Sequence, residues 1–167
     1  MVISEWLRRR LPPAQRLEWY PPFRAMRVKV LVLENDWRDV RLLLPLARNR
    51  NLGGGMFGGA VACLADPVAA LACARVFPGH EVWTRKLVLD FRHEARTDLE
   101  LRFRFDAGQE LDIGGELQRR GRATPTFEYS FFDTRERACV GVTCRVAIRP
   151  AGYRPGTGSH RSKSRDE

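Results

Sequence analysis

Residues 51–77 read NLGGGMFGGAVACLADPVAALACARVF, and this stretch decides the fold. It opens with a glycine-rich turn and continues as a run rich in alanine and leucine, in which Asp66 and Arg75 are the only charged residues. A helix that is apolar on all sides belongs in a protein interior. At 1.5 Å per residue, a helix over residues 56–77 is about 33 Å long, enough to cross a sheet. The stretch therefore predicts a buried central helix.

Runs typical of strands lie on both sides of this helix. Before it, residues 28–46 hold two apolar stretches joined at Asn35-Asp36, which predicts a β-hairpin. After it, strands are predicted over residues 82–91, 99–105, 124–132 and 138–148. Residues 106–122 predict a short helix or a long turn. Parallel strands need long crossovers, and only one is available, so the sheet is expected to be mainly antiparallel. The expected fold class is α+β.

The ends of the chain differ from its middle. Residues 3–20 place aromatic residues and leucines among arginines, which predicts an amphipathic helical start, broken near Pro12-Pro13 and ended by Pro21-Pro22. The last residues are small, polar and charged, which predicts disorder. We therefore divide the chain into a helical N-terminal segment (residues 1–22), one domain (23–150) and a disordered basic tail (151–167).

The net charge of +9 gathers at the ends. Residues 1–27 carry six Arg and two Glu, and residues 154–167 add a further net charge of +2. A nucleic-acid-binding domain concentrates its charge on one folded face or helix. No nucleic-acid partner is therefore expected, although the basic ends keep that reading open as a third hypothesis. A positive field equally suits a phosphorylated ligand.

The cysteines and the apolar segments bear on location. The four cysteines form no C-x-x-C pair and no zinc-binding pattern, so we expect small buried side chains in a reducing cytosol and no metal. The first residues lack the apolar region of a secretory signal. The apolar run over residues 58–74 is short for a membrane span and is interrupted by Asp66 and Pro67. A cytoplasmic protein without a membrane span is expected.

The central stretch resembles the signature of hotdog-fold thioesterases. In that family an Asn precedes a glycine-rich turn, a Gly-Gly pair opens a long helix, and a carboxylate follows about two turns later. Asn51, Gly58-Gly59 and Asp66 match this pattern, and LVLDFRHEA at residues 87–95 is similar to the strand that follows the helix. The resemblance covers roughly residues 20–150. It is strongest to the PaaI-like branch, often filed as a domain of unknown function.

The resemblance implies an architecture and a substrate. It implies a hotdog fold in which an antiparallel sheet of five or six strands wraps around the helix. It also implies a homodimer or a dimer of dimers, with active sites between protomers. The implied substrate is an acyl thioester of coenzyme A or of a carrier protein, with coenzyme A present only as part of the substrate and no separate cofactor.

Thioester hydrolysis needs an activated water or a nucleophile, and donors for the oxyanion that forms. A helix N-terminus offers free N–H groups, so we assign Gly58 and Gly59 as oxyanion donors. Asp66 is assigned as general base or nucleophile, facing a pocket between protomers. Two other readings stay open. The glycines would simply allow close packing, and Asp66 would cap a second helical segment that begins at Pro67.

Further residues complete the predicted site. Asn51 either orients the attacking water or holds the glycine-rich turn. Met56 and Phe57 are predicted to contact substrate. Phe57 stands where many members of the wider family have His, so a non-catalytic module that binds acyl groups or a protein partner is the alternative function.

The strand after the helix supplies the other predicted substrate contacts. By resemblance, Thr84 lies near the thioester, with Trp83 and Arg85 beside it. Strand alternation predicts that Arg85 points away from Thr84 and Lys86. Arg85, Lys86 and Arg92 are candidates for holding a phosphate. The competing reading is that these charges only solvate an exposed strand face.

Overall fold

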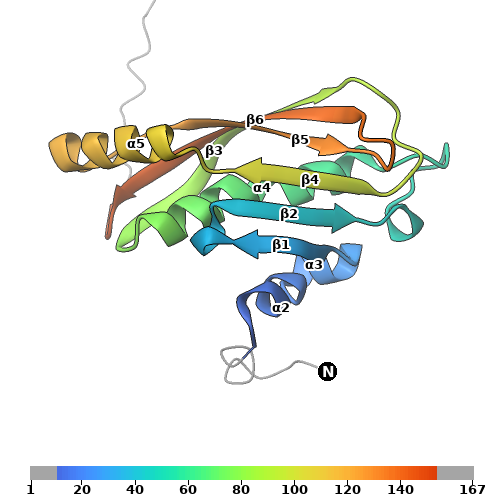
Figure 1. Cartoon of the computed structure of the whole chain (residues 1–167), viewed down its shortest axis with the longest axis horizontal. Helices are drawn as coiled ribbons and strands as arrows, with labels where there is room; N and C mark the ends of the chain where they lie inside the picture. The colour runs from blue at the N-terminus through green and yellow to red at the C-terminus, as the bar shows by residue number, and fades with distance from the viewer. Residues whose placement is uncertain (1–10, 154–167) are drawn as a thin grey trace, which may run out of the picture.

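The computed structural model describes residues 11–153 and shows one antiparallel six-stranded sheet packed on a single long helix, α4 (Figure 1). The sheet order is β1-β2-β4-β5-β6-β3. The strands are β1 (Lys29–Glu34), β2 (Asp39–Leu44), β3 (His80–Phe91), β4 (Leu99–Arg104), β5 (Thr126–Phe132) and β6 (Ala138–Pro150). The helices are α2 (Pro13–Glu18), α3 (Pro21–Met26), α4 (Gly58–Val76) and α5 (Ala107–Arg120), with 3-10 turns η1 (Asn35–Trp37) and η2 (Leu46–Arg48).

The predicted α+β class is confirmed, and so is the hairpin, since β1 pairs antiparallel with β2. The segment predicted as a short helix or a turn is the helix α5. Its start is capped by the Asp106 carboxylate, which accepts the Gln109 N–H at 3.0 Å, and it ends at Gly121 in the left-handed conformation. A polar cap and a terminal glycine are strong helix boundaries.

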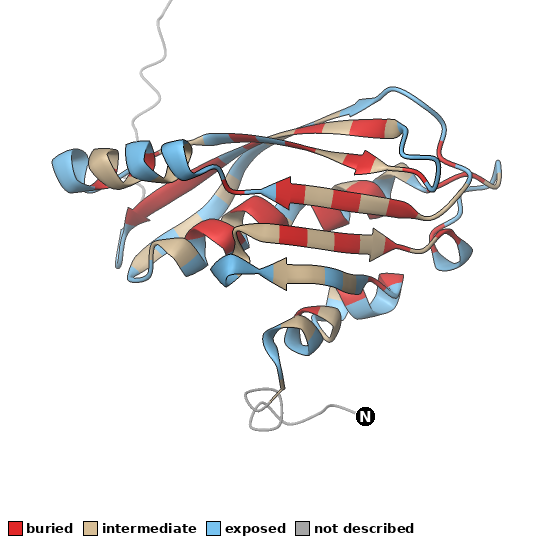
Figure 2. Cartoon of the chain, in the orientation of Figure 1, coloured by how far each residue is buried: buried red, intermediate tan, exposed pale blue. Residues whose placement is uncertain are grey.

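The central helix is buried on one side only. Its buried residues, such as Leu64, Val68 and Ala72, belong to the core that the helix shares with the sheet. Figure 2 shows red, tan and pale blue segments alternating along α4. By length and composition α4 is apolar enough to cross a membrane, with a mean hydropathy of 1.5 over 18 residues. Among the described residues no other helix meets that test. Only 44% of this window is buried in the chain, so a large part of its apolar surface is exposed.

The prediction for Pro67 is corrected. It does not open a second helical segment behind an Asp66 cap, because α4 runs unbroken through it. A proline inside a helix removes one N–H donor, which leaves the Cys63 carbonyl without its usual helical partner. Cys63 is also exposed, contrary to prediction, whereas the other three cysteines are buried. All four are free thiols.

The N-terminal segment is corrected in one respect. Pro21 and Pro22 do not end a helix; they occupy the first positions of α3, where a missing N–H costs nothing. Helix α3 therefore spans the boundary expected at residue 22, and its Phe23 is fully buried in the domain core. Residues 1–10 and 154–167, with most of the predicted disordered tail, lie outside the described residues.

The strand β3 forms one edge of the sheet and contains a β-bulge between Thr84 and Lys86. The bulge inserts a residue and breaks the strand alternation. Arg85 and Lys86 are therefore both exposed, and the prediction that they point in opposite directions is wrong. Thr84 keeps its predicted side and faces α4.

Candidate active site

The glycine-rich turn is closed by Asn51. Its Oδ1 accepts the Gly55 N–H at 3.1 Å, and its Nδ2 donates to the Met56 carbonyl at 3.4 Å. The Asn51 main-chain N–H donates to the Gly55 carbonyl at 2.8 Å. The structure thus shows the turn-holding role of Asn51. Its role toward an attacking water stays a prediction.

A second asparagine, which sequence reasoning missed, anchors this region. Asn49 is buried, and its Nδ2 donates to the carbonyls of Met26 and Pro45, both at 2.8 Å. Its own carbonyl accepts the Phe57 N–H at 2.7 Å. Asn49 therefore ties the end of α3, the start of η2 and the N-cap of α4 together. Nothing in the sequence distinguishes it from Asn51, because both stand in the same polar stretch.

The tip of α4 presents free donors. Phe57 is the N-cap residue but supplies no side-chain acceptor, and its carbonyl accepts from Ala60 and Val61. Within residues 11–153, the N–H groups of Gly58 and Gly59 donate to no acceptor. The positive end of the helix dipole adds to these donors. The predicted oxyanion donors are thus unoccupied and available.

Two aromatic rings lie against the glycine pair. A Cβ on Gly59 would come within 2.4 Å of the Phe57 ring, and a Cβ on Gly58 would lie 3.3 Å from the Phe91 ring. Both phenyl groups are 54% exposed. The glycines therefore do allow close packing, and that packing leaves the amides free. The two readings of the Gly-Gly pair are compatible.

Asp66 lies on the exposed face of α4. Among residues 11–153 its carboxylate makes no ion pair or hydrogen bond, and it does not line any of the hollows described below. It stands seven residues beyond Gly59, which is about 10 Å along the helix axis. One substrate carbonyl therefore cannot contact the Asp66 carboxylate and the Gly59 amide of the same chain.

The backbone around Asp66 is clamped from the sheet. The Thr84 hydroxyl donates to the Asp66 carbonyl, and the buried Tyr129 hydroxyl donates to the Ala65 carbonyl, each at 2.7 Å. Burial raises the pKa of Tyr129 far above its usual range, so this hydroxyl stays a donor. Burial also raises the pKa of the Cys144 thiol, which lies beside both hydroxyls. The clamp fixes the point from which the Asp66 side chain leaves the helix.

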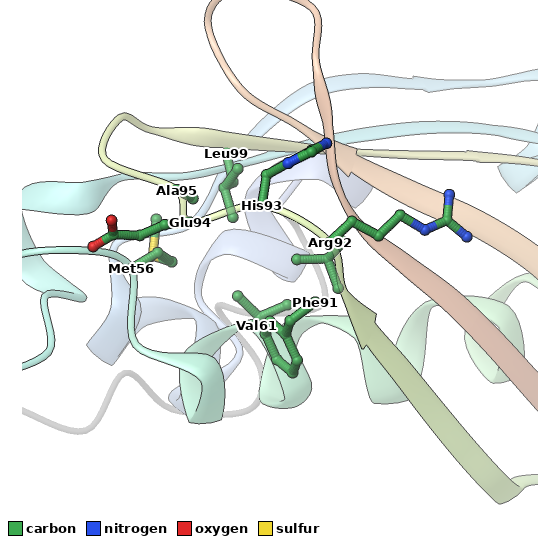
Figure 3. A pocket seen from close by; sticks show the side chains of 9 residues that line it. Met56, Val61, Phe91, Arg92, His93, Glu94, Ala95 and Leu99 are labelled. Atoms are coloured by element: carbon green, nitrogen blue, oxygen red, sulfur yellow. The ribbon is translucent and has the colours of Figure 1, made fainter.

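A small cavity of about 160 Å³ lies beside the tip of α4 (Figure 3). Its lining residues are Met56, Val61, Phe91, Arg92, His93, Glu94, Ala95, Leu99 and Val140. Met56, predicted to contact substrate, is a buried member of this set. His93, interpreted from the sequence as isolated, lines the same cavity. The volume is below the roughly 300 Å³ of a typical small-molecule site.

A larger apolar hollow of about 330 Å³ lies between α2 and α4, where α4 contributes Pro67 and Leu71. We call it the α2–α4 groove, and it is lined by Pro13, Arg16, Leu17, Tyr20, Trp37, Pro67 and Leu71. Its size falls within the range of small-molecule sites. Sequence reasoning missed it, because it depends on how the N-terminal segment packs.

The remaining predicted substrate residues are not brought to Asp66 within this chain. Trp83 and Arg85 are exposed on the face of β3 opposite to Thr84. Trp83 stacks on Tyr153, with ring centroids 6.1 Å apart. Among the described residues, no cluster of His, Cys, Asp and Glu could hold a metal ion.

These features define a class of protein. The structure has an antiparallel sheet packed on one long helix, with a glycine-rich turn before the helix and one carboxylate along it. This is the hotdog fold found in thioesterases. The sequence matches the domain of unknown function DUF4442 over residues 14–148, and the chain belongs to this family. No curated protein matches the sequence.

Solved structures share this fold. A protein of unknown function from Pseudomonas aeruginosa, named as a probable thioesterase, is 24% identical, with a TM-score of 0.73 over 89% of this chain and 97% of its own. A thioesterase from Haemophilus influenzae is 10% identical, with a TM-score of 0.64 over 86% and 95%. The PaaI protein of E. coli, from the phenylacetic acid degradation operon, is 13% identical, with a TM-score of 0.59 over 79% and 86%. At these identities the likeness shows the fold.

Proposed function

We propose that this protein hydrolyses acyl thioesters at a site shared between two copies of the chain. The observation that carries the proposal is the separation along α4: a lone exposed carboxylate, Asp66, stands about 10 Å from the free amides of Gly58 and Gly59. A second copy with the opposite helix direction supplies the missing partner for each group.

The helix surface permits such a pairing. Two antiparallel copies of α4 that cross midway between Gly59 and Asp66 meet at Ala62 and Cys63. Both side chains are small, and Cys63 is exposed. Small residues at a crossing allow two helices to approach closely. Each Asp66 then faces the Gly59 of the other helix.

The strand β3 supports the same axis. Thr84 lies beside Asp66, because its hydroxyl donates to the Asp66 carbonyl, and the Phe91 ring lies beside Gly58. The midpoint between Thr84 and Phe91 falls between Leu87 and Val88, and Val88 is 45% exposed on this edge strand. An antiparallel β3 pair centred there and the antiparallel α4 pair share one twofold axis. A homodimer with a self-complementary interface follows.

The chemistry then divides between the two copies. The Asp66 carboxylate acts as base on a water, or as nucleophile, toward the thioester carbonyl carbon. The Gly58 and Gly59 amides of the other copy stabilise the oxyanion. Collapse of the tetrahedral intermediate breaks the carbon–sulfur bond, and the thiolate takes up the proton that Asp66 removed from the water, so a thiol and a carboxylic acid leave. If Asp66 is the nucleophile, the acyl-aspartyl anhydride that forms is then hydrolysed by water. The α2–α4 groove, which Pro67 and Leu71 of the same helix line, receives the acyl group, because it is apolar and of suitable volume.

The test is a panel of short, long and aromatic acyl-CoA substrates with the purified protein. Asp66→Asn and Asp66→Ala are expected to lower kcat by about 10²–10⁴ and to leave folding and oligomeric mass unchanged. Asp112→Asn, an exposed carboxylate on α5, is the control and is expected to be fully active. If Asp66→Ala hydrolyses the thioesters as fast as the wild type does, the proposal is contradicted.

A non-catalytic acyl-binding module is the second candidate, and Phe57 favours it. A phenyl ring at the helix tip neither donates nor accepts a proton, and it covers the Gly59 Cα. This function predicts that acyl-CoA raises the thermal stability of the protein without being hydrolysed. Turnover in the panel decides between the two.

A further inference from the structure

A basic hollow of about 530 Å³ lies beside α3 and carries no assigned role. It is lined by Trp19, Pro21, Arg24, Ala25, Arg27 and Arg48. We propose that this hollow binds the phosphate groups of coenzyme A, which makes coenzyme A rather than a carrier protein the donor of the acyl group. The inference rests on the proposed thioesterase function and names its substrate class.

The charge of the hollow is unbalanced. Arg24, Arg27 and Arg48 are all exposed, and within residues 11–153 none of them forms an ion pair. No carboxylate is among the lining residues. Three guanidinium groups around one hollow repel one another unless an anion lies between them. Guanidinium groups bind phosphate through paired N–H donors, which suits a ligand with more than one phosphate.

The backbone at the hollow is specialised as well. Arg27 ends α3 with φ at +59°, the left-handed conformation that glycine adopts most easily. A residue other than glycine is strained in this conformation. The Arg27 side chain is placed at the hollow despite this strain. Arg24 lies over the Trp19 ring, 4.6 Å from the centroid, so an aromatic surface adjoins the charges.

The hollow is joined to the catalytic end of α4 through Asn49. The Asn49 side chain binds the Met26 carbonyl, next to Arg27, and its main-chain carbonyl accepts the Phe57 N–H. Arg48 precedes Asn49 directly. With 3.8 Å between successive Cα atoms and the hydrogen bond from Phe57 to Asn49, the Arg48 Cα lies within roughly 12 Å of the Gly58 amide. The oxyanion donors and the basic hollow are thus held by one buried side chain.

Coenzyme A fits this arrangement better than a carrier-protein arm. Its nucleotide end presents a pyrophosphate and a 3′-phosphate close together beside an adenine ring, whereas a carrier-protein arm ends in one phosphodiester. Two of the other candidate cations, Arg92 and Arg85, are placed less well. Arg92 is engaged by Asp90 at 2.8 Å, and Arg85 lies on the opposite face of β3 from Thr84. In the proposed dimer, the acyl group and the nucleotide extend to opposite sides of the thioester.

The test removes the charges and compares three thioesters with the same acyl group: acyl-CoA, acyl-3′-dephospho-CoA and acyl-pantetheine. Changing Arg24, Arg27 and Arg48 to Gln together is expected to raise KM for acyl-CoA at least tenfold, with kcat unchanged. KM for acyl-pantetheine, which has no phosphate, should stay at the wild-type value. Arg104→Gln, an exposed arginine on β4, is the matched control and should change neither.

A binding measurement keeps the inference separate from catalysis. Adenosine 3′,5′-bisphosphate is expected to raise the melting temperature of the wild type and of Asp66→Ala, but not of the triple variant. An unchanged KM for acyl-CoA in the triple variant, or equal losses with acyl-pantetheine, would overturn the hollow as the phosphate site. Faster turnover of an acyl-carrier protein than of acyl-CoA would overturn the choice of donor. If no thioester is hydrolysed, the proposed function fails while the bisphosphate result still decides on the hollow.

Discussion

The two edge strands of the sheet, β1 and β3, differ in length and in whether a helix covers them. The β1 edge is short, and α2 covers it: Glu18 accepts the Val30 N–H at 3.0 Å and pairs with Lys29. The β3 edge is twelve residues long, and no described residue pairs with its outer side. Proteins normally block a long edge strand, because its free N–H and C=O groups recruit another chain. The contrast supports our proposal that the chain closes one edge itself and pairs the other with a second copy.

The largest effect is expected from charging the open edge. The variant Val88→Glu places two like charges close together at the centre of the paired β3 strands. We expect the mass in solution to fall to that of one chain and turnover to vanish, because each site loses one of its halves. Light scattering and the acyl-CoA assay measure the two outcomes.

A chemical probe checks the geometry of the same interface. Cys63 is the exposed cysteine of the four and lies at the proposed helix crossing. A short cross-linker with two thiol-reactive maleimide groups should therefore link two wild-type chains through Cys63, and Cys63→Ala should abolish the product. An active monomer would contradict the proposal that β3 is the edge at which two copies pair. Cross-linking that the β3 variant does not reduce would contradict it as well.

The helix tip gives the next largest effect. Gly58→Pro removes one N–H donor, and proline is tolerated at the first helical position after an extended residue such as Phe57. We expect kcat to fall about 10²–10³-fold, the usual loss for one oxyanion donor. Gly58→Ala keeps the N–H and adds a Cβ near Phe91, so it serves as the steric control. Equal losses in both variants would indicate packing rather than hydrogen bonding.

The next prediction concerns the hydrogen bonds that hold the backbone at Asp66. Tyr129→Phe deletes the buried hydroxyl that binds the Ala65 carbonyl. Unfolding free energy should fall by about 1 kcal/mol, the net value of one buried hydrogen bond. Because the backbone at Asp66 loses a fixed point, kcat should fall by roughly tenfold with KM unchanged. Tyr153→Phe, on an exposed ring outside the α2–α4 groove, is the control. A stability loss without a change in kcat would argue against a positioning role.

The smallest effect belongs to the closed edge. Glu18→Ala removes the acceptor of the Val30 N–H and the ion pair with Lys29. Urea unfolding should show a loss of about 1 kcal/mol. Mass and kcat should stay at wild-type values, because this edge faces no second copy in our account. A change in mass would show that the two edges are not functionally distinct.

The parts of this molecule that could be predicted from sequence are those with strong local signals. The apolar stretch around Leu64, the Asn35-Asp36 turn and the alternating strands led to the α+β fold, because periodicity and turn chemistry are written in neighbouring residues. The features that were predicted wrongly depend on tertiary packing. The bulge at Arg85, the exposure of Cys63 and the helix start at Pro21 are set by partners far away in the sequence.

The candidate site divides in the same way. The Gly-Gly pair and Asp66 stand out locally, as a helix tip without side chains and as a lone acid in an apolar run. Asn49 and Tyr129 could not be singled out, because their importance lies in the carbonyl groups they bind. The basic hollow could not be foreseen either, since Arg24 and Arg48 come together only after α3 packs beside η2.

The shared site is tested most directly by mixing two inactive variants. Asp66→Asn keeps its helix tip, and Gly58→Pro keeps its carboxylate. When they are unfolded and refolded together in equal amounts, half of the dimers are mixed, and one of the two sites in each mixed dimer is intact. The account predicts recovery of about a quarter of wild-type activity per chain. Activity no higher than the average of the separate variants would contradict a site built from two chains.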